Sequence, residues 1–266
     1  VPYDFLGSQS LGSNHHTGAA MVDKDHEGHG GQGAVFFNRN LGDAVPWPTK
    51  DPDFILFNLG TNDIINATPD TVTQTFTWLL KNMLRDKCPT STIIVQGIGE
   101  RNDRTTTTSR AQMNAVLEGI VNNMRRGGDT NIYFVENTTT QADLGPDGIH
   151  PTHSGHKKIA DQFWSVMNTV LGENPDRGAP SAPTHQSSRD DAASTSVVSA
   201  APGVNKGVTI WPVGDSITKG VGGNPHIGLH GPSRHYRAYL ANTLKANSVP
   251  YDFLGSQSLG SNHHTG

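Results

Sequence analysis

Apolar residues gather along this chain in short runs that alternate with longer stretches of helical spacing. The runs are rich in valine, isoleucine and phenylalanine and end at glycine, proline or asparagine, a pattern that predicts buried strands. They cover residues 3–6 or their copy at 251–254, and residues 52–60, 92–97, 131–136 and 208–214. Because the longer runs are continuously apolar, we expect strands covered on both faces, as in a parallel sheet.

Helices are predicted where apolar residues recur at intervals of three and four. This spacing runs through residues 69–87, 105–126, 155–171 and 233–246, and another helix should follow the glycine-rich turn at 25–33. We expect Ser154 to cap the helix over 155–171, and Gly127 and Gly128 to end the helix before them. Strands alternating with helices predict an α/β fold: a three-layer α/β/α sandwich around a five-stranded parallel sheet in flavodoxin-like order.

The chain divides into two structured parts and a linker. Helical and strand periodicity stops after residue 173, and proline, serine, alanine and threonine dominate residues 174–203. We therefore assign residues 1–173 and 204–266 to the two parts of one domain, joined by a flexible or partly extended linker. The 266 residues are enough for one such domain with a substantial core.

Residues 1–18 recur without a change at 249–266. Identity this complete is not a diverged structural repeat. It is consistent with tandem, nearly identical domains, with a circular assembly that overlaps itself, or with an engineered permutant. Only one copy can take a given place in the fold, so we expect the other to be displaced, disordered or paired with another molecule.

Charge and composition narrow the classes of partner. The net charge is −4, charged residues make up 17% of the chain, and there is no basic block, so neither nucleic acid nor an anionic membrane is expected as a partner. We find no apolar run long enough to cross a bilayer. Cys88 is the single cysteine, which excludes an intrachain disulfide.

Ser216 stands two residues after the end of the strand predicted over 208–214. In open α/β sheets the reacting groups lie at the carboxyl ends of the strands, where a serine can act as a nucleophile and the amides of a following helical turn can face a negative charge. The alternative is that Ser216 only caps that turn.

Three other stretches place polar groups or glycines after strands or in turns. In residues 25–33, Gly31 is a candidate backbone donor, although a plain turn is the alternative. A zinc site at His26 and His29 is disfavoured because the spacing is not HExxH. Asn62 follows the strand at 52–60 and is either a turn former or a side-chain donor to an oxyanion.

Asp147 and His150 lie three residues apart in a loop rich in glycine and proline. An aspartate that orients a histidine is the arrangement that removes a proton from a serine near neutral pH. An ordinary hydrogen bond within the loop is the alternative.

Together, these four stretches resemble the SGNH subgroup of the GDSL esterases and lipases, whose four blocks contribute a serine, a glycine, an asparagine and a histidine. The blocks are Gly214-Asp-Ser-Ile217, the glycines of residues 26–31, Gly60-Thr-Asn-Asp63 and Asp147-Gly-Ile-His150. The order departs from the family, because the serine block comes last here and first there. Joining residues 204–248 to 1–173 restores the family order, so we interpret the chain as a circular permutation.

The resemblance implies a mechanism without a metal or organic cofactor. Ser216 is then the nucleophile, His150 the base, and Asp147 the residue that orients it. The oxyanion hole consists of the amides of Ser216 and Gly31 and the side chain of Asn62. Asp215, beside the nucleophile, is expected to hold the turn by hydrogen bonds. The longer signature Gly214-Asp-Ser-Ile-Thr-Lys-Gly220 is most similar to carbohydrate esterase family three, which removes acetyl groups from xylan.

The function expected from this resemblance is a secreted, extracellular carbohydrate acetylesterase acting on an acetylated polysaccharide or oligosaccharide in a shallow cleft, partly formed by residues 219–232. A short-chain esterase or lysophospholipase is the alternative within the enzyme class. A non-catalytic carbohydrate-binding unit, in an array where neighbouring tandem domains are partners, is the alternative outside it.

Overall fold

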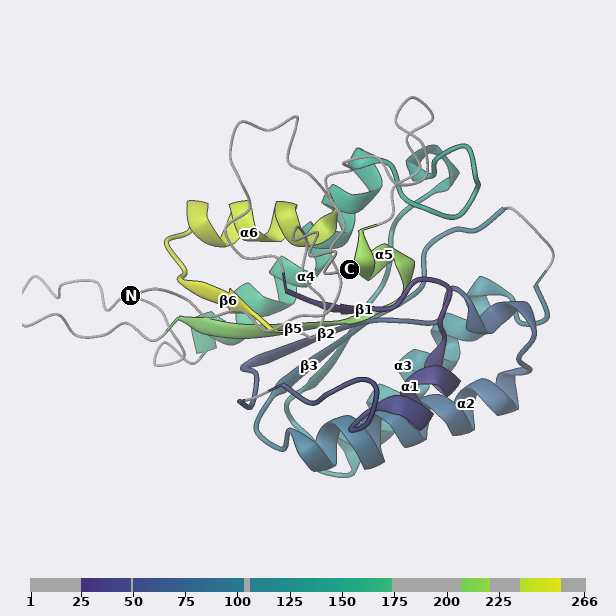
Figure 1. Cartoon of the computed structure of the whole chain (residues 1–266), viewed down its shortest axis with the longest axis horizontal. Coiled ribbons are helices and arrows are strands. Elements are labelled where there is room, and N and C mark those ends of the chain that lie inside the picture. The colour runs from purple at the N-terminus through teal and green to yellow at the C-terminus, as the bar shows by residue number, and fades with distance from the viewer. Residues whose placement is uncertain (1–24, 49, 103–105, 174–206, 221–234, 255–266) are drawn as a thin grey trace, which may run out of the picture.

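The computed structural model describes residues 25–48, 50–102, 106–173, 207–220 and 235–254 (Figure 1). The strands are β1 (Glu27–Gly28), β2 (Phe54–Asn58), β3 (Thr92–Gln96), β4 (Ile132–Val135), β5 (Val208–Gly214) and β6 (Tyr251–Phe253). The main helices are α1 (Ala34–Asn40), α2 (Pro69–Thr77), η2 (Trp78–Arg85), α3 (Arg110–Arg126), α4 (His153–Glu173), α5 (Ser216–Lys219) and α6 (Tyr236–Ala246). Two short 3₁₀ turns complete the set, η1 (Asp63–Ile65) and η3 (Gln141–Asp143).

The strands form one parallel sheet in the order β1-β5-β2-β3-β4, with β6 on the same side of β5 as β1. All five predicted strands are present, and β6 is formed by the C-terminal copy of the duplicated segment. The residues predicted as a glycine-rich turn also contribute a sixth strand, β1, because Glu27 and Gly28 continue the sheet edge beyond β6. Residues 1–24 and the predicted linker lie outside the described residues.

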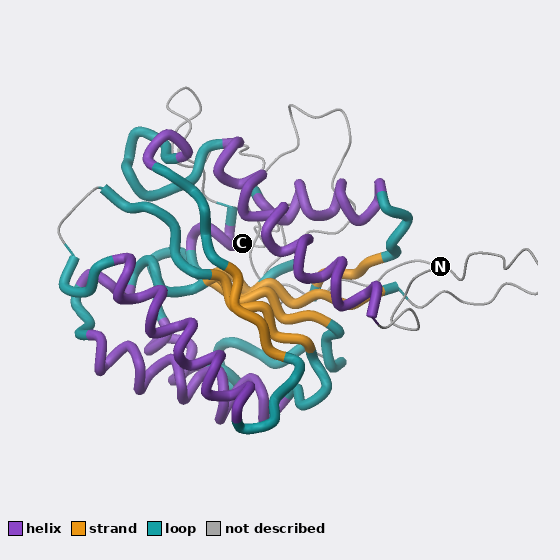
Figure 2. The backbone as a smooth tube through the Cα atoms, turned by 180° about the vertical axis from the view of Figure 1, so that it is seen from behind, coloured by secondary structure: helices purple, strands orange, loops and turns teal. Residues whose placement is uncertain are grey.

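Helices cover both faces of the sheet, as expected for a three-layer sandwich. In Figure 1, α4 and α6 lie on one side, and α1, α2 and α3 lie on the other. Figure 2 shows the same division from behind, with the twisted strands between the two groups of helices. The strand β5, which comes late in the sequence, lies between β1 and β2 inside the sheet, so strands from both structured parts of the chain belong to one sheet.

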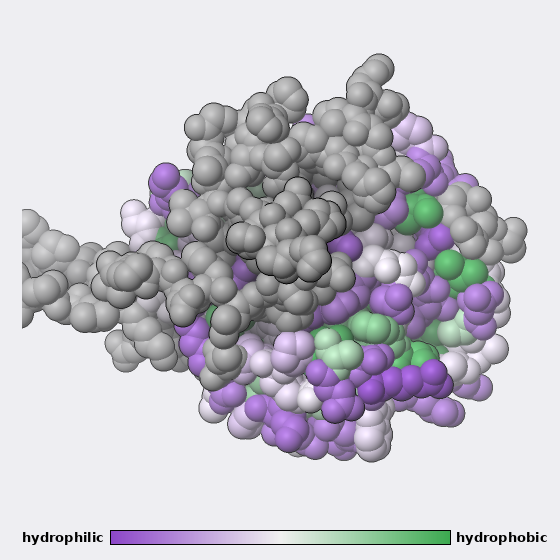
Figure 3. Space-filling view, in the orientation of Figure 1, coloured by the Kyte–Doolittle hydropathy of each residue, from purple (hydrophilic) through white to green (hydrophobic). Residues whose placement is uncertain are grey.

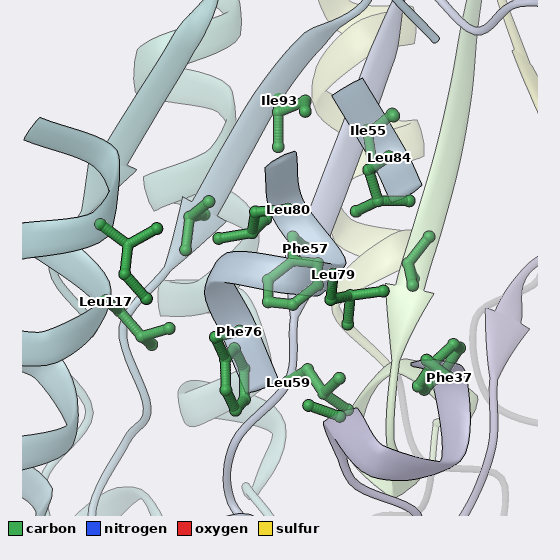
Figure 4. Packing of buried hydrophobic residues seen from close by; sticks show 14 of the residues in the cluster. Phe37, Ile55, Phe57, Leu59, Phe76, Leu79, Leu80, Leu84, Ile93 and Leu117 are labelled. Carbon is green, nitrogen blue, oxygen red and sulfur yellow. The ribbon is translucent and has the colours of Figure 1, made fainter. Parts of the chain in front are cut away.

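The larger core cluster lies between the sheet and helices α1, α2, η2 and α3. Figure 4 shows part of it, with Phe57 and Phe76 packed edge to face at 5.9 Å between ring centres. The second cluster joins β2, β3, β5 and β6 to α4 and α6 through residues such as Phe163, Leu240 and Phe253. Most of the apolar residues on the predicted helices are buried, and Met83, Val116, Met124 and Val166 are among those that are partly exposed.

Several predicted helix ends were wrong by a few residues. Helix α3 begins at Arg110 because Ser109 and Gln112 form a capping box. Helix α4 begins at His153, so Ser154 is not its cap; the Ser154 hydroxyl instead donates a hydrogen bond to Asp143. Helix α6 begins at Tyr236. The helix predicted over 69–87 changes from α-helical to π-helical geometry at Trp78.

The described surface is mainly polar. On the face seen in Figure 3, hydrophilic residues predominate and apolar residues are confined to small areas. Among the described residues, the large apolar side chains that are exposed are Val35 and Trp78. None of the helices in this part of the chain combines the length and the apolar character needed to cross a membrane.

Candidate active site

The candidate residues collect at the edge of the sheet where the parallel strands end. Ser216 follows β5, Asn62 follows β2, and Gly31 follows β1. His150 stands in the loop between β4 and α4. In a parallel sheet these ends share one edge, which brings groups from both parts of the chain together.

Close packing at the end of β5 positions Ser216. A side chain at Gly214 would collide with the carbonyl of Asn58 and with Thr218, so only glycine allows β5, β2 and α5 to approach this closely. The cap of α5 is Asp215, whose Oδ1 accepts a hydrogen bond from the amide of Ile217 at 2.9 Å. Ser216 is therefore not the cap, and its hydroxyl is available for another partner.

That partner is His150. The Oγ atom of Ser216 lies 2.8 Å from Nε2 of His150, and Nδ1 of the same ring lies 2.7 Å from Oδ2 of Asp147. All three side chains are partly buried. The chain from hydroxyl to imidazole to carboxylate is the arrangement in which a histidine can take the serine proton while the carboxylate fixes the tautomer of the ring.

Asp147 is held in its charged form. Burial raises its pKa, but hydrogen bonds from the His150 ring and from the amides of Ile149 and His150 outweigh burial and bring the pKa below the ordinary value. Both amides donate to Oδ1 at 3.0 Å, which leaves Oδ2 to the imidazole. The carboxylate is thus ionised near neutral pH and can stabilise an imidazolium.

Asp143 anchors the loop that carries this pair. Its carboxylate accepts hydrogen bonds from the Thr140 amide, the Ser154 hydroxyl and the Lys158 ammonium group at 2.6 to 3.0 Å. Burial raises its pKa, but these bonds, led by that of Lys158, lower it to about 2. The loop is therefore tied to the start of α4. Nothing in the sequence pattern around Asp143 predicts this role.

The two other predicted oxyanion donors lie in connected loops. Gly31 is exposed and has φ of +75°, a left-handed conformation that favours glycine. The side-chain amide of Asn62 donates to the carbonyl of Gln32 at 2.9 Å. One of its two N–H groups thus fixes the side chain beside the glycine turn, and the other remains for a ligand.

Two carboxyl groups at this edge of the sheet, those of the partly buried Asp63 and the buried Asp215, have raised pKa values. Oδ1 of Asp63 accepts the amide of Ala34 at 2.9 Å, tying the loop after β2 to the start of α1. Burial raises the pKa of Asp63 to about 6. Complete burial, with a further contribution from Asp63, raises the pKa of Asp215 to about 7, although the Ile217 amide opposes this shift. Asp215 thus holds its turn by a hydrogen bond, as predicted. The tie from Asp63 to α1 and the two raised pKa values were not predicted, because nothing in the sequence pattern shows that these carboxyl groups are shielded from water.

A second missed feature is a chain of side-chain amides. The Nδ2 atom of Asn58 donates to Gln96, Gln96 donates to Gln162 at 2.6 Å, and Gln162 donates to Thr138 at 2.7 Å. This chain connects β2, β3, α4 and the loop after β4. Isolated amide residues in apolar runs are the only sequence signal for it.

The histidines of the glycine-rich segment have other partners. His26 accepts the amide of Gly28, and His29 pairs with the buried Glu27. Burial, followed by the nearby Arg237, lowers the pKa of His26 well below the ordinary value. Within the described ranges, no three histidine, cysteine, aspartate or glutamate side chains are grouped in a way that could hold a metal ion. The predicted pocket segment 219–232 lies outside the described residues from residue 221 onward.

Comparisons with known proteins found a matching family model and similar solved structures. The model of the GDSL-like lipase/acylhydrolase family matches residues 8–158. An acetyl esterase variant crystallised with acetate is similar in structure, with 26% identity, a TM-score of 0.53, and coverage of 64% of this chain and 83% of its own. A carbohydrate esterase of family 3 from Talaromyces cellulolyticus has 26% identity, a TM-score of 0.52 and the same coverage. No curated protein sequence matches.

The family match covers more than half of the chain and includes the segments with Gly31, Asn62 and His150. The esterase structures share the α/β sandwich with its parallel sheet. These findings support ester hydrolase activity. The chain belongs to the GDSL-like lipase/acylhydrolase family.

Proposed function

We propose that the protein is a serine esterase that removes acetyl groups from a carbohydrate ester by way of an acyl-enzyme. The observation that carries this proposal is the hydrogen-bonded chain from Ser216 through His150 to Asp147. It joins a residue of β5–α5 to residues of the β4–α4 loop, so it is not a local turn interaction.

In the first half of the reaction, Ser216 attacks the ester carbonyl while His150 takes the hydroxyl proton. The tetrahedral intermediate then expels the sugar alkoxide, which receives that proton from His150. In the second half, His150 removes a proton from water, which attacks the acyl-enzyme and releases acetate and the free serine. Asp147 keeps the ring in the required tautomer throughout.

The negative oxygen of each intermediate needs fixed donors. We assign this role to the amides of Ser216 and Gly31 and to Nδ2 of Asn62. Asn62 is held through Gln32. Gly31 is exposed, and no atom of the described residues lies within 4 Å of the point where a Cβ atom would stand. As far as the described residues define it, the site is open beside the glycine, which suits an acyl group attached to a large, hydrated alcohol.

The acetyl and carbohydrate parts of the proposal are supported by the two similar structures, one an acetyl esterase and the other a carbohydrate esterase of family 3. Short-chain ester hydrolysis without a preference for sugars, or lysophospholipid hydrolysis, is the alternative in the same family.

We also propose that the chain is a circular permutation of the family unit. The family match ends at residue 158, before Ser216. When β5 is counted first and β6 second, the sheet order β6-β5-β2-β3-β4 becomes 2-1-3-4-5, the flavodoxin-like order. Sequencing of the intact gene tests this point, because a gene in which every serine block precedes its own histidine block would instead establish tandem units.

The activity is tested by hydrolysis of 4-nitrophenyl acetate, 4-nitrophenyl octanoate and acetylated xylan by the wild-type protein and by Ser216→Ala. Ser165→Ala, which changes an exposed serine on α4, is the matched control. We expect acetate release from xylan and a preference for the acetyl ester, both lost in Ser216→Ala only. Preference for the octanoyl ester would support the lipid alternative, and no turnover by folded protein would contradict esterase function.

A further inference from the structure

The edge strand β6 occupies a well-defined place on the sheet. It pairs in parallel with Val208–Ile210 of β5. The amide of Val208 donates to the carbonyl of Pro250 at 2.8 Å, and the amide of Leu254 donates to the carbonyl of Ile210 at 2.6 Å. The Phe253 side chain is 1% exposed and belongs to the second core cluster. Strand β6 is therefore held on β5 by backbone hydrogen bonds and by one fully buried apolar side chain, that of Phe253.

The chain carries a second segment with the same groups at the same spacing. Residues 1–6 have the sequence of residues 249–254, so Pro2, Phe5 and Leu6 correspond to Pro250, Phe253 and Leu254. Every interaction that holds β6 on β5 can be made by residues 1–6, because the interacting atoms are chemically identical.

The path of the chain also allows the exchange. Strand β1 runs along the same edge of β5 as β6, in the same direction, and pairs with Val213 and Gly214 just beyond Ile210. A segment docked in the place of β6 would thus lead toward β1 along a gap of about 10 Å. Residues 7–24 connect the two, and roughly 18 residues can span ~60 Å when extended.

We propose that the edge of β5 along Val208–Ile210 is a docking site with two interchangeable occupants, and that residues 1–6 fill it when residues 251–254 are displaced. The proposal does not depend on the esterase activity. In the intact chain the C-terminal copy holds the site because it follows α6 after a short turn, whereas the N-terminal copy is tethered by a longer segment. A tether of this length still holds residues 1–6 at an effective concentration on the order of millimolar near the edge of β5. The exchange should therefore lower the free energy of unfolding only slightly.

The test is a set of four variants followed by thermal unfolding: Phe5→Asp, Phe253→Asp, the two changes combined, and Phe163→Asp. Phe163 is fully buried in the same core cluster and has no duplicate, so it is the matched control. We expect no change in Tm for Phe5→Asp and a fall of about 5 °C or less for Phe253→Asp, which reflects the longer tether.

The combined variant and Phe163→Asp should each lose on the order of 15 °C or fail to fold, because an apolar anchor of the core is then missing. If Phe253→Asp alone is as destabilised as the combined variant, the N-terminal copy does not occupy the site and the proposal is wrong. Equal effects of Phe5→Asp in the wild-type and Phe253→Asp backgrounds would overturn it as well, since interchangeable occupants require non-additive effects.

Discussion

In the part of the chain that the structure describes, two histidine–carboxylate pairs of similar composition lie at the same edge of the sheet. In the first, Asp147 contacts Nδ1 of His150, and Nε2 contacts Ser216. In the second, the fully buried Glu27 contacts Nε2 of His29, whose ring packs against Phe36 and Phe37 at 5.0 and 5.5 Å between ring centres. The carboxylate leaves Nε2 to a serine in one pair and occupies Nε2 in the other.

The comparison shows that a histidine close to a carboxylate in the sequence does not by itself identify a base. Both pairs are separated by only two or three residues and both lie in glycine-containing segments. What differs is which ring nitrogen the carboxylate takes and whether a nucleophile reaches the other. We therefore propose His150 as the base, whereas His29 stabilises the segment that leads to Gly31 through its contacts with Glu27 and the two phenylalanines.

Replacing each of the two histidines in turn should give the largest difference in kcat between the two pairs. His150→Ala and Ser216→Ala should each lower kcat for 4-nitrophenyl acetate by about 10⁴- to 10⁶-fold, because nucleophile and base act as a unit. His29→Ala should keep activity within an order of magnitude when rates are corrected for folded protein by circular dichroism. Equal losses in His150→Ala and His29→Ala would contradict the assignment.

The carboxylates give the next contrast. Asp147→Asn should lower kcat by about 10⁴-fold with little change in Tm, because the amide favours the wrong imidazole tautomer. Glu27→Gln alters the buried hydrogen bond to His29 and should lower Tm by several degrees while the rate per folded molecule changes little. If Glu27→Gln reduced kcat as strongly as Asp147→Asn, the assignment of a structural role to Glu27 and a catalytic role to Asp147 would be wrong.

A smaller effect is expected beside the glycine turn. Asn62→Ala removes one proposed oxyanion donor and should lower kcat by about 10²- to 10³-fold. Gln32→Ala is the matched control, since Gln32 holds Asn62 through its backbone carbonyl and the substitution retains that group. Wild-type turnover by Asn62→Ala would exclude Asn62 from the oxyanion hole.

The buried carboxyl groups predict a pH dependence of stability. The pKa of Asp215 is raised from 3.8 to about 7, so the folded protein binds its proton more tightly than the unfolded chain does. Its contribution to stability is therefore greatest near and below pH 4 and is lost as the pH rises through 7.

Asp215→Asn cannot ionise, so between pH 5 and 8 its Tm should rise relative to wild type by on the order of 5 °C. Asp143→Asn is the control, because the pKa of Asp143 is lowered to about 2 and its contribution is constant over this range. A constant difference between Asp215→Asn and wild type from pH 5 to 8 would show that Asp215 does not titrate there.

The sequence predicted the elements well because continuous apolar runs and helical spacing report directly on burial. It also indicated Ser216, His150 and Asp147, which stand in polar turns after predicted strands and which the structure brings together. Helix starts were less accurate, since the capping box at Ser109 and the tie between Ser154 and Asp143 depend on side-chain geometry.

The supporting residues were not predictable for a related reason. Asp63 stabilises its loop through the amide of Ala34, and Asp143 stabilises its loop through the side chain of Lys158. Both partners are distant in the sequence from the carboxyl group that they contact. The chain Asn58–Gln96–Gln162 crosses three elements. Strand β1 has two residues and exists only because β5 offers a free edge. These features follow from the tertiary arrangement and not from local periodicity.

Activation of Ser216 by His150 can be measured by covalent labelling with an alkyl fluorophosphonate and mass spectrometry of the digested protein. We expect one phosphonyl adduct on the peptide that contains Ser216, formed rapidly in the wild type, absent in Ser216→Ala and slowed by at least about 10³-fold in His150→Ala. Failure of the folded wild type to react, or equal labelling rates in wild type and His150→Ala, would contradict this activation.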